Sequence, residues 1–364
     1  MTEDAPVESD RVPGAPHPRE TATLVGQDAA VAQFHAAATS GRLHHGWLIT
    51  GPRGTGKATL AWRIARWLLA GAGSPDLSVP PDHPVARRLL ALSEPRLHLV
   101  RRSLDDKGRL RGEIVVDDMR RLLSFFQLSA VEGGRRVAII DAADDMNPNA
   151  ANALLKLLEE PPRDALLLLV AHRPARLLPT IRSRCRELRL APLSPGDMAR
   201  ALAPLEVPGD AARLAALSGG SVGEALRLAG QDGLDRYAQL VALFSRHPDM
   251  DRHAAAAFAQ GAAGRPGAEG DPFDLTMTLI ELFLARAARS GLLGPPLPEA
   301  APQESATLAR MSPDDRAARH WAGALAELSA RARAGRAVNL DPAALVMDML
   351  LTLAQGRADT PGRG

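Results

Sequence analysis

Strand-like and helical patterns alternate over the N-terminal half of the chain. Apolar positions recur at helical spacing from Leu24 to Phe34, and short runs bounded by turn residues follow, as is typical of buried strands. The strand-like runs cover residues 47–50, 97–100, 137–140, 166–170 and 187–190. Helical stretches lie between them at residues 58–69, 117–127 and 148–160. This alternation predicts an α/β domain with a parallel sheet and helices on both of its faces.

The helix expected at residues 148–160 has the clearest ends. Asn147 can cap its first turn, and Pro148 suits the first helical position. Pro161 and Pro162 then stop it.

After Pro192 only helical patterns remain. Three short helices are expected at residues 198–205, 210–217 and 222–228, with Gly219 and Gly220 as a natural helix end. Longer helices are expected at residues 234–245, 273–288, 313–332 and 342–354. The C-terminal part is therefore predicted to be all-helical, and no heptad repeat is sustained long enough for a coiled coil.

The two ends of the chain lack such patterns. Residues 1–20 contain four prolines and scattered charges without an apolar period, which predicts a disordered tail. A second short tail is expected at residues 358–364.

Charge and hydropathy exclude some classes of protein. Lys plus Arg number 44 and Asp plus Glu 42, a net charge of +2, so any contact with DNA must come from a local patch. The longest apolar run, residues 165–171, is far shorter than the ~18 residues that cross a bilayer. The acidic, proline-rich N-terminus is unlike a secretory leader, and a cytoplasmic location is expected.

The residue counts narrow the search for chemistry. Cys185 is the only cysteine and cannot build a thiolate zinc site alone; no zinc is predicted, and His83 and His98 are interpreted as ordinary polar residues. Only three of the 44 basic residues are lysines, which leaves 44 − 3 = 41 arginines. Each lysine is therefore a candidate for a role that a guanidinium does not fill.

One lysine, Lys57, ends a glycine-rich loop between an expected strand and an expected helix. The loop and the start of the helix comprise Gly51, Pro52, Arg53, Gly54, Thr55, Gly56, Lys57, Ala58 and Thr59. Backbone amides of such a loop wrap phosphate oxygens, the helix N-terminus adds positive potential, and the lysine reaches the terminal phosphates. A merely flexible loop is the competing interpretation.

Two positions, 58 and 142, lack side-chain groups that metal-assisted hydrolysis uses. Ala58 stands where a Ser or Thr hydroxyl would complete a magnesium shell, and Thr59 lies about 100° round the helix. Asp141 ends an apolar strand, where a magnesium-organising carboxylate belongs. The residue after it, Ala142, cannot orient water as an acid would. The alternative for Asp141 is a solvated residue at the end of a strand.

Arg184 lies just before the last expected strand. The planar guanidinium group of an arginine can donate to a γ-phosphoryl group during its transfer, and it can do so across a subunit boundary. In a chain so rich in arginine, a solvated surface residue is the competing interpretation.

Taken together, these segments resemble the bacterial clamp-loader branch of the AAA+ ATPases, and within it the delta-prime subunits of DNA polymerase III. The segments that carry the resemblance are residues 24–27, 43–48, 51–59, 151–162 and 183–185. The stretch from Asn152 to Pro162, which reads Asn-Ala-Leu-Leu-Lys-Leu-Leu-Glu-Glu-Pro-Pro, is the most specific of them.

The resemblance implies a RecA-like nucleotide-binding domain at residues 21–191, a helical lid at 192–231 and a helical collar for ring assembly at 232–357. It implies a ring with delta and tau or gamma subunits that loads the sliding clamp on primed DNA, with ATP or ADP at the loop. Arg184 is then expected to enter the ATP site of a neighbouring subunit. The polymerase reaction would belong to other chains of the holoenzyme, because no carboxylate cluster suggests a two-metal synthesis site.

Departures from the family pattern separate the two types of clamp-loader subunit. An ATPase motor of the tau/gamma type should have a hydroxyl at 58, an acid at 142, a polar sensor near the end of the fourth strand and a lid arginine after Ser221. The chain has Ala58, Ala142, Ala171 followed by His172, and Gly223. These losses favour a delta-prime-like subunit with weak or absent hydrolysis of its own. An active tau/gamma-like motor and a small-molecule kinase are the alternatives.

Overall fold

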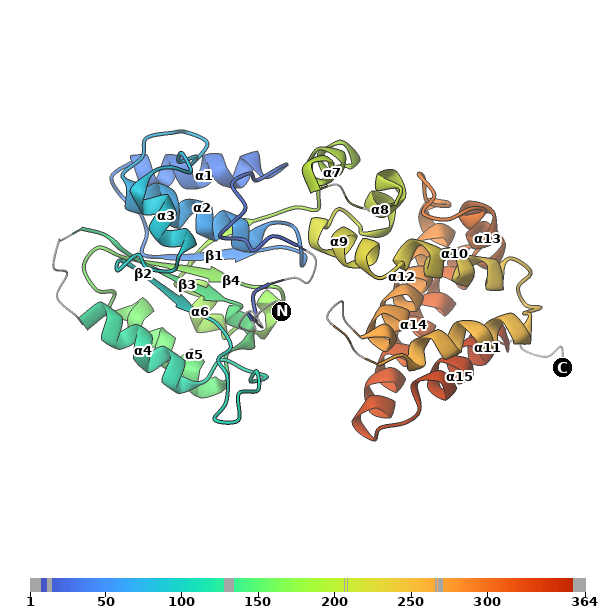
Figure 1. The fold of residues 1–364 in the computed structure, drawn as a ribbon. Helices are drawn as coiled ribbons and strands as arrows, with labels where there is room; N and C mark the ends of the chain where they lie inside the picture. Colours follow the sequence, from blue (N-terminus) through green and yellow to red (C-terminus); the bar gives the residue numbers. More distant parts are fainter. Residues whose placement is uncertain are drawn as a thin grey trace, which may run out of the picture. The chain divides into compact units, whose positions relative to one another are not determined.

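The chain forms two compact units in the computed structural model, Met1–Asp197 and Met198–Gly364 (Figure 1). Within the chain, the structure describes residues 8–11, 15–127, 134–205, 207, 209–265, 267 and 271–355. The predicted tail at 358–364 lies outside the described residues. The division of residues 192–357 into a lid and a collar stays a prediction.

The N-terminal unit is built on a five-stranded sheet in the order β2-β3-β4-β1-β5. Its strands are β1 (Gly46–Thr50), β2 (Leu97–Val100), β3 (Arg136–Asp141), β4 (Ala165–Val170) and β5 (Arg186–Arg189). Every neighbouring pair is parallel. The predicted α/β fold with a parallel sheet is therefore confirmed.

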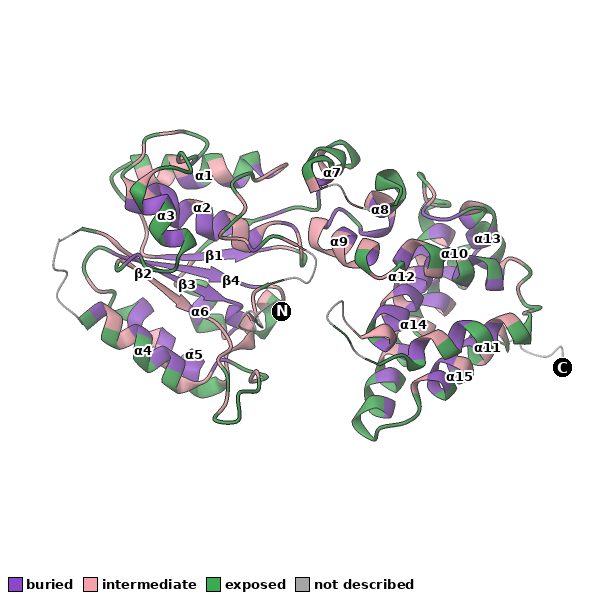
Figure 2. Cartoon of the chain, viewed as in Figure 1, coloured by how far each residue is buried: buried purple, intermediate pink, exposed green. Residues whose placement is uncertain are grey.

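Helices cover both faces of this sheet (Figure 1). The first group comprises α1 (Asp28–Thr39), α2 (Lys57–Ala70) and α3 (Pro84–Leu90), which share one apolar core with the sheet. The second group comprises α4 (Val116–Gln127), α5 (Pro148–Glu159) and α6 (Pro179–Ser183), which share a core on the other face. Figure 2 shows the buried residues concentrated where helices and sheet meet.

Local sequence explains several of these elements. All six residues of β4 are buried, because a central parallel strand is covered on both faces, whereas β5 lies at the edge and buries only Leu188. Asn147 caps α5 by accepting from the backbone N–H of Ala150 at 2.9 Å, and Pro148 occupies the first turn. The predicted ends of this helix are confirmed.

Helix α3 is absent from the sequence prediction. His83 caps it, its Nδ1 accepting from the backbone N–H of Val85 at 3.2 Å. The other histidine considered above, His98, stacks on Phe125 with ring centroids 5.2 Å apart.

The sequence predicts a disordered tail over residues 1–20. This prediction is wrong for residues 8–11 and 15–20, which pack onto the rest of the N-terminal unit. The side chains of Asp10 and His17 are fully buried. The arginine that holds this segment, Arg101, lies 91 residues away along the sequence, so the partner that orders it is invisible to a local reading.

The C-terminal unit is helical in all its described regular elements, as predicted. Its helices follow α7 (Pro195–Leu202), which contains the junction of the two units. They are α8 (Ala211–Leu217), α9 (Val222–Gly230), α10 (Gly233–Phe244), α11 (Arg252–Gln260), α12 (Pro272–Leu293), α13 (Glu304–Met311), α14 (Asp315–Ala337) and α15 (Pro342–Gln355). The sequence analysis missed α11 and α13, which are short.

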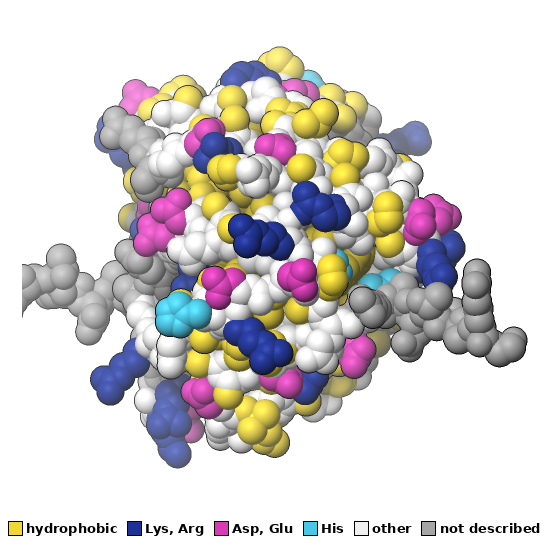
Figure 3. All heavy atoms as spheres, turned by 90° about the vertical axis from the view of Figure 1, so that its right-hand side faces the viewer, with side chains coloured by type: hydrophobic (Ala, Val, Ile, Leu, Met, Phe, Trp, Pro, Cys, Tyr) yellow, Lys and Arg dark blue, Asp and Glu magenta, His cyan; other side chains and the backbone are white. Residues whose placement is uncertain are grey.

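No helix among the described residues is both long and apolar enough to span a bilayer. The face drawn in Figure 3 intermixes basic, acidic and apolar side chains rather than gathering one sign of charge. This mixture agrees with the near-zero net charge of the sequence.

Candidate functional site

The glycine-rich loop joins β1 to α2 at the carboxyl edge of the sheet. Gly51 has φ of 139°, and a Cβ there would lie 2.5 Å from the carbonyl oxygen of Leu190. Gly56 precedes the first turn of α2 with φ of 93°. Side chains at these two positions would strain the backbone or collide, so the local conformation explains both glycines.

Buried polar contacts fix the loop to the rest of the unit. The side-chain amide of Gln27 donates to the carbonyl oxygens of Thr55 at 3.2 Å and Ala191 at 2.8 Å. The hydroxyl of Thr55 donates to the carbonyl oxygen of Pro52 at 2.8 Å. The segment around Gln27, residues 24–27, therefore holds the loop in position through these hydrogen bonds.

Lys57 is buried, with only 2% of its surface exposed. Its Nζ donates to the carbonyl oxygens of Gly51 at 2.8 Å and Pro52 at 2.5 Å, both within the loop itself. Burial lowers the pKa of Lys57 to about 8, although the charges of Asp141 and Asp144 act in the opposite direction. At neutral pH the loop therefore holds a desolvated cation suited to phosphate oxygens.

Asp141 lies at the end of β3 on the same edge of the sheet. Burial, together with the charge of Asp10, raises its pKa to about 7, while the charge of Lys57 acts in the opposite direction. Ala142 is buried beside it and offers no carboxylate. Lys57 and Asp141 influence each other's pKa, so the two charges lie near one another at this edge, while their role in nucleotide binding stays a prediction.

Asp144 serves a structural purpose at this edge. Its carboxylate accepts from the backbone N–H groups of His172 at 2.8 Å and Arg173 at 2.9 Å. These bonds tie the residues after β3 to those after β4. Asp144 is thus not a free substitute for the acid missing at position 142.

His172 is the site residue to which the sequence analysis gave no role. Burial lowers its pKa to about 4, and the positive charge of Lys57 acts in the same direction, so the imidazole is neutral at pH 7. Its Nδ1 is buried without a hydrogen-bond partner in the described part of the chain. His172 lies near the loop because β4, which it follows, pairs with β1, which leads into the loop.

Arg184 lies at the opposite edge of the sheet from the loop. It follows α6 and precedes the amino end of β5, and its backbone adjoins Gly46 at the amino end of β1. The loop begins at the other end of β1, about 13 Å away for a strand of this length. Arg184 thus faces away from the phosphate loop of its own chain.

The guanidinium of Arg184 is held in place but is not buried. It donates to the carbonyl oxygen of Thr180 at 3.1 Å and pairs with Glu159 at 2.9 Å. Its side chain is 37% exposed. Such a surface pair is weak, so the guanidinium is available to another binding partner.

The N-terminal unit is similar in sequence to known proteins. Residues 26–194 match the family described as DNA polymerase III, delta subunit. A DNA polymerase III subunit delta' from Pseudomonas aeruginosa is 41% identical over 203 residues, 54% of this chain and 59% of that protein. The N-terminal part of this chain resembles a delta' subunit. The family match covers both the glycine-rich loop and Arg184.

Other relatives align over similar lengths. The delta' subunit of Bacillus subtilis is 35% identical over 193 residues, 52% of this chain and 55% of that protein. A gamma/tau subunit from Mycobacterium bovis is 32% identical over 195 residues, 51% of this chain and 31% of its own length. The chain thus spans less than two thirds of these relatives, and the family match ends before the helical unit at 198–364.

One prediction concerns the charge of the site itself. The pKa of folded Asp141, about 7, lies above its ordinary value of 3.8. Between pH 3.8 and about pH 7, the carboxyl group of Asp141 is deprotonated in the unfolded chain and protonated in the folded chain. The free energy of unfolding therefore falls as pH rises through this range. Asp141→Asn removes the charge and should stabilise the N-terminal unit at pH 8 by on the order of a few kcal/mol.

Hydrogen exchange of the β3 amides at several pH values measures this gain. The gain should be small near pH 4, grow to about pH 7 and then level off. A gain that is the same at every pH would contradict a buried carboxyl with a raised pKa.

Proposed function

We propose that the chain works as a delta-prime-type subunit of the bacterial DNA polymerase III clamp loader, in the cytoplasm. One observation carries the proposal: the glycine-rich loop and Arg184 lie at opposite edges of the same sheet. The loop edge lacks the hydroxyl at 58 and the acid at 142, while the other edge presents Arg184. This arrangement suits a subunit that assists a neighbour's hydrolysis.

In this function the partners are delta and tau or gamma subunits, and through them the sliding clamp and primed DNA. Arg184 would enter the ATP site of an adjacent subunit and stabilise the charge on the transferred phosphoryl group. The partial exposure of its side chain and its weak tie to Glu159 support this role.

The glycine-rich loop would bind the phosphates of ATP or ADP in this chain. The backbone amides around Gly54 and Gly56 and the ammonium of Lys57 have the required chemistry. Lys57 must first leave the carbonyl oxygens of Gly51 and Pro52. Because Ala58 has no hydroxyl and Ala142 has no carboxylate, bound nucleotide would persist rather than be cleaved.

The experiment is reconstitution with purified delta and tau/gamma subunits. We expect the chain to join them in one complex on gel filtration and to raise their clamp-dependent ATP hydrolysis. Failure to enter the complex would overturn the proposal. The C-terminal unit is included, because the proposal assigns ring assembly to it.

The second candidate is an active motor of the tau/gamma type, which the 32% identity to a gamma/tau subunit favours. A motor of this type hydrolyses ATP with magnesium as the isolated chain. A delta-prime-type subunit should instead hydrolyse ATP no faster than the Lys57→Ala variant. Vigorous ATPase activity of the isolated chain that Lys57→Ala abolishes would establish the motor instead.

A further inference from the structure

Three elements meet around Arg184 at the amino edge of the sheet. They are the C-terminal end of α5, the short helix α6 and the start of β1. A Cβ at Gly46, the first residue of β1, would stand 2.9 Å from the side chain of Leu158 and 3.3 Å from the carbonyl oxygen of Arg184. Because glycine has no side chain, the end of α5 and the backbone of Arg184 can both pack closely against β1.

A histidine fixes the end of α5. The Nε2 of His45 lies 3.0 Å from the carbonyl oxygen of Leu158, one of the last carbonyls of the helix, which lack partners within it. A carbonyl oxygen only accepts, so Nε2 carries the proton in this contact. Burial, and after it the charge of His44, lower the pKa of His45. A neutral imidazole therefore holds the turn of α5 that carries Glu159.

The two terminal nitrogens of Arg184 have different partners. Nη2 pairs with Glu159 at 2.9 Å, and Nη1 donates to the carbonyl oxygen of Thr180 at 3.1 Å. A guanidinium has five N–H groups, so three of them are left over by these two contacts. Arg182 lies two residues earlier and is exposed, and its side chain has no hydrogen bond or ion pair within the described part of the chain. Of these two arginines, the fold therefore orders Arg184.

This ordering changes what binding costs the side chain. An arginine side chain has many rotamers, and it loses that freedom when it forms a defined contact. Contacts that restrict it beforehand reduce the loss. Glu159 is 50% exposed, and an ion pair in such a place is weak and screened by water. The pair therefore restricts the guanidinium while leaving most of its attraction for an anion.

We infer that Glu159 is a positioning residue for Arg184: its carboxylate, with the carbonyl oxygen of Thr180, keeps the guanidinium in the orientation in which it meets a phosphoryl group bound by a neighbouring subunit. The inference rests on the proposed function and adds to it a residue that does not itself touch the nucleotide. His45 acts one step further away, because it holds the helix end that carries Glu159.

The test is ATP hydrolysis by the full-length chain reconstituted with delta and tau/gamma subunits, clamp and primed DNA. Glu159→Ala should lower kcat at the site that this chain adjoins by about tenfold, the size of effect that ordering one long side chain has. KM for ATP should stay within about twofold of wild type, because the guanidinium acts on charge that develops in the transition state. Glu159→Gln keeps an oxygen that can accept from Nη2, so its kcat should stay within about threefold of wild type. In an Arg184→Ala background, Glu159→Ala should have no further effect.

Glu160→Ala is the matched control, since it removes the same charge from the next residue, which is also exposed, and it should leave kcat unchanged. An unchanged or raised kcat in Glu159→Ala would overturn the positioning role. So would an equal loss in Glu160→Ala, an equal loss in Glu159→Gln, or a further loss in the Arg184→Ala background. Each of these results leaves the proposed function in place as long as Arg184→Ala lowers turnover. No effect of Arg184→Ala itself would instead remove the proposed role of Arg184 and this inference together.

Discussion

Replacing Arg184 with alanine should lower ATP turnover of the reconstituted clamp loader by about 10³-fold or more at the site that this chain adjoins. A guanidinium at the transferred phosphoryl group stabilises charge that develops only in the transition state. The effect should therefore appear in kcat, with little change in KM for ATP. Steady-state hydrolysis with clamp and primed DNA measures it, after nucleotide sites elsewhere in the ring are inactivated.

Two further variants separate this role from loss of charge or of folding. Arg182→Ala removes an exposed arginine of α6, the helix that ends just before Arg184, and should leave turnover unchanged. Arg184→Lys keeps the charge but not the fork, and most of the activity should be lost. Both variants should assemble normally, because the pair with Glu159 lies at the surface. Turnover of the Arg184→Ala complex within twofold of wild type would exclude the role.

The chemistry near the glycine-rich loop could largely be predicted from the sequence, because it is local. The positions of Gly51, Gly56 and Lys57 follow from one loop between a strand and a helix. Asp141 was predictable as the end of an apolar strand. A parallel sheet then puts both segments at its carboxyl edge.

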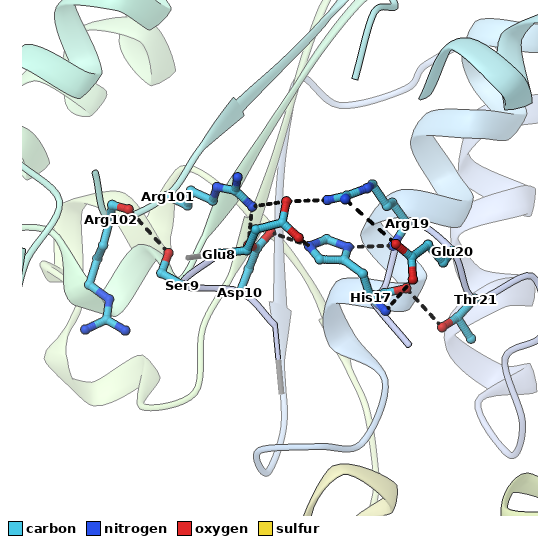
Figure 4. Close-up of polar contacts among 9 residues, drawn as sticks. All are labelled: Glu8, Ser9, Asp10, His17, Arg19, Glu20, Thr21, Arg101 and Arg102. Carbon is cyan, nitrogen blue, oxygen red and sulfur yellow. Dashed lines mark hydrogen bonds and ion pairs between the residues drawn. The ribbon is translucent and has the colours of Figure 1, made fainter. Parts of the chain in front are cut away.

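Contacts made across the sheet were not predictable in the same way. The order β3-β4-β1 decides that His172 and Asp144 lie near Lys57, and a single sequence does not give strand order. The placement of the N-terminal segment, residues 8–11 and 15–20, could not be predicted for a related reason. Its acidic side chains and prolines have the composition of a solvated tail, and only the distant Arg101 makes them buried partners (Figure 4).

The position of Arg184 could be predicted from the sequence only in part. Its place before β5 was visible in the sequence, and a parallel sheet alone implies that such a residue lies at the amino edge, away from the loop. Its pairing with Glu159 at the end of α5 required the packed structure. In the proposed function this pairing would orient the guanidinium without burying it.

Glu304→Ala should destabilise the helical unit by about 3–5 kcal/mol, the usual cost of removing one partner of a buried ion pair. Glu304 is fully buried and accepts from Arg286 of α12 at 2.5 Å and 3.0 Å. It also accepts from the Tyr237 hydroxyl and from the backbone N–H of Ala300, each at 2.6 Å. Arg286 in turn donates to the carbonyl oxygen of Ala216 in α8 at 2.9 Å. Loss of the carboxylate leaves several buried donors without an acceptor.

Hydrogen exchange of α10 and α12 amides measures this loss within the helical unit, where a whole-chain melting curve would mix two units. Glu304→Gln should still destabilise strongly, because the amide leaves the charge of Arg286 uncompensated in the interior. Asp315→Asn is the control: it removes the same charge from a pair with Arg319 whose side chains are 66% and 72% exposed, and should cost less than about 1 kcal/mol. Near-equal effects of Glu304→Ala and Asp315→Asn would contradict a buried network that joins α8, α10, α12 and α13. A large difference would mean that this one carboxylate fixes how helices on both sides of the predicted lid and collar boundary pack, and in the proposed function ring assembly would then depend on a buried residue of the helical unit.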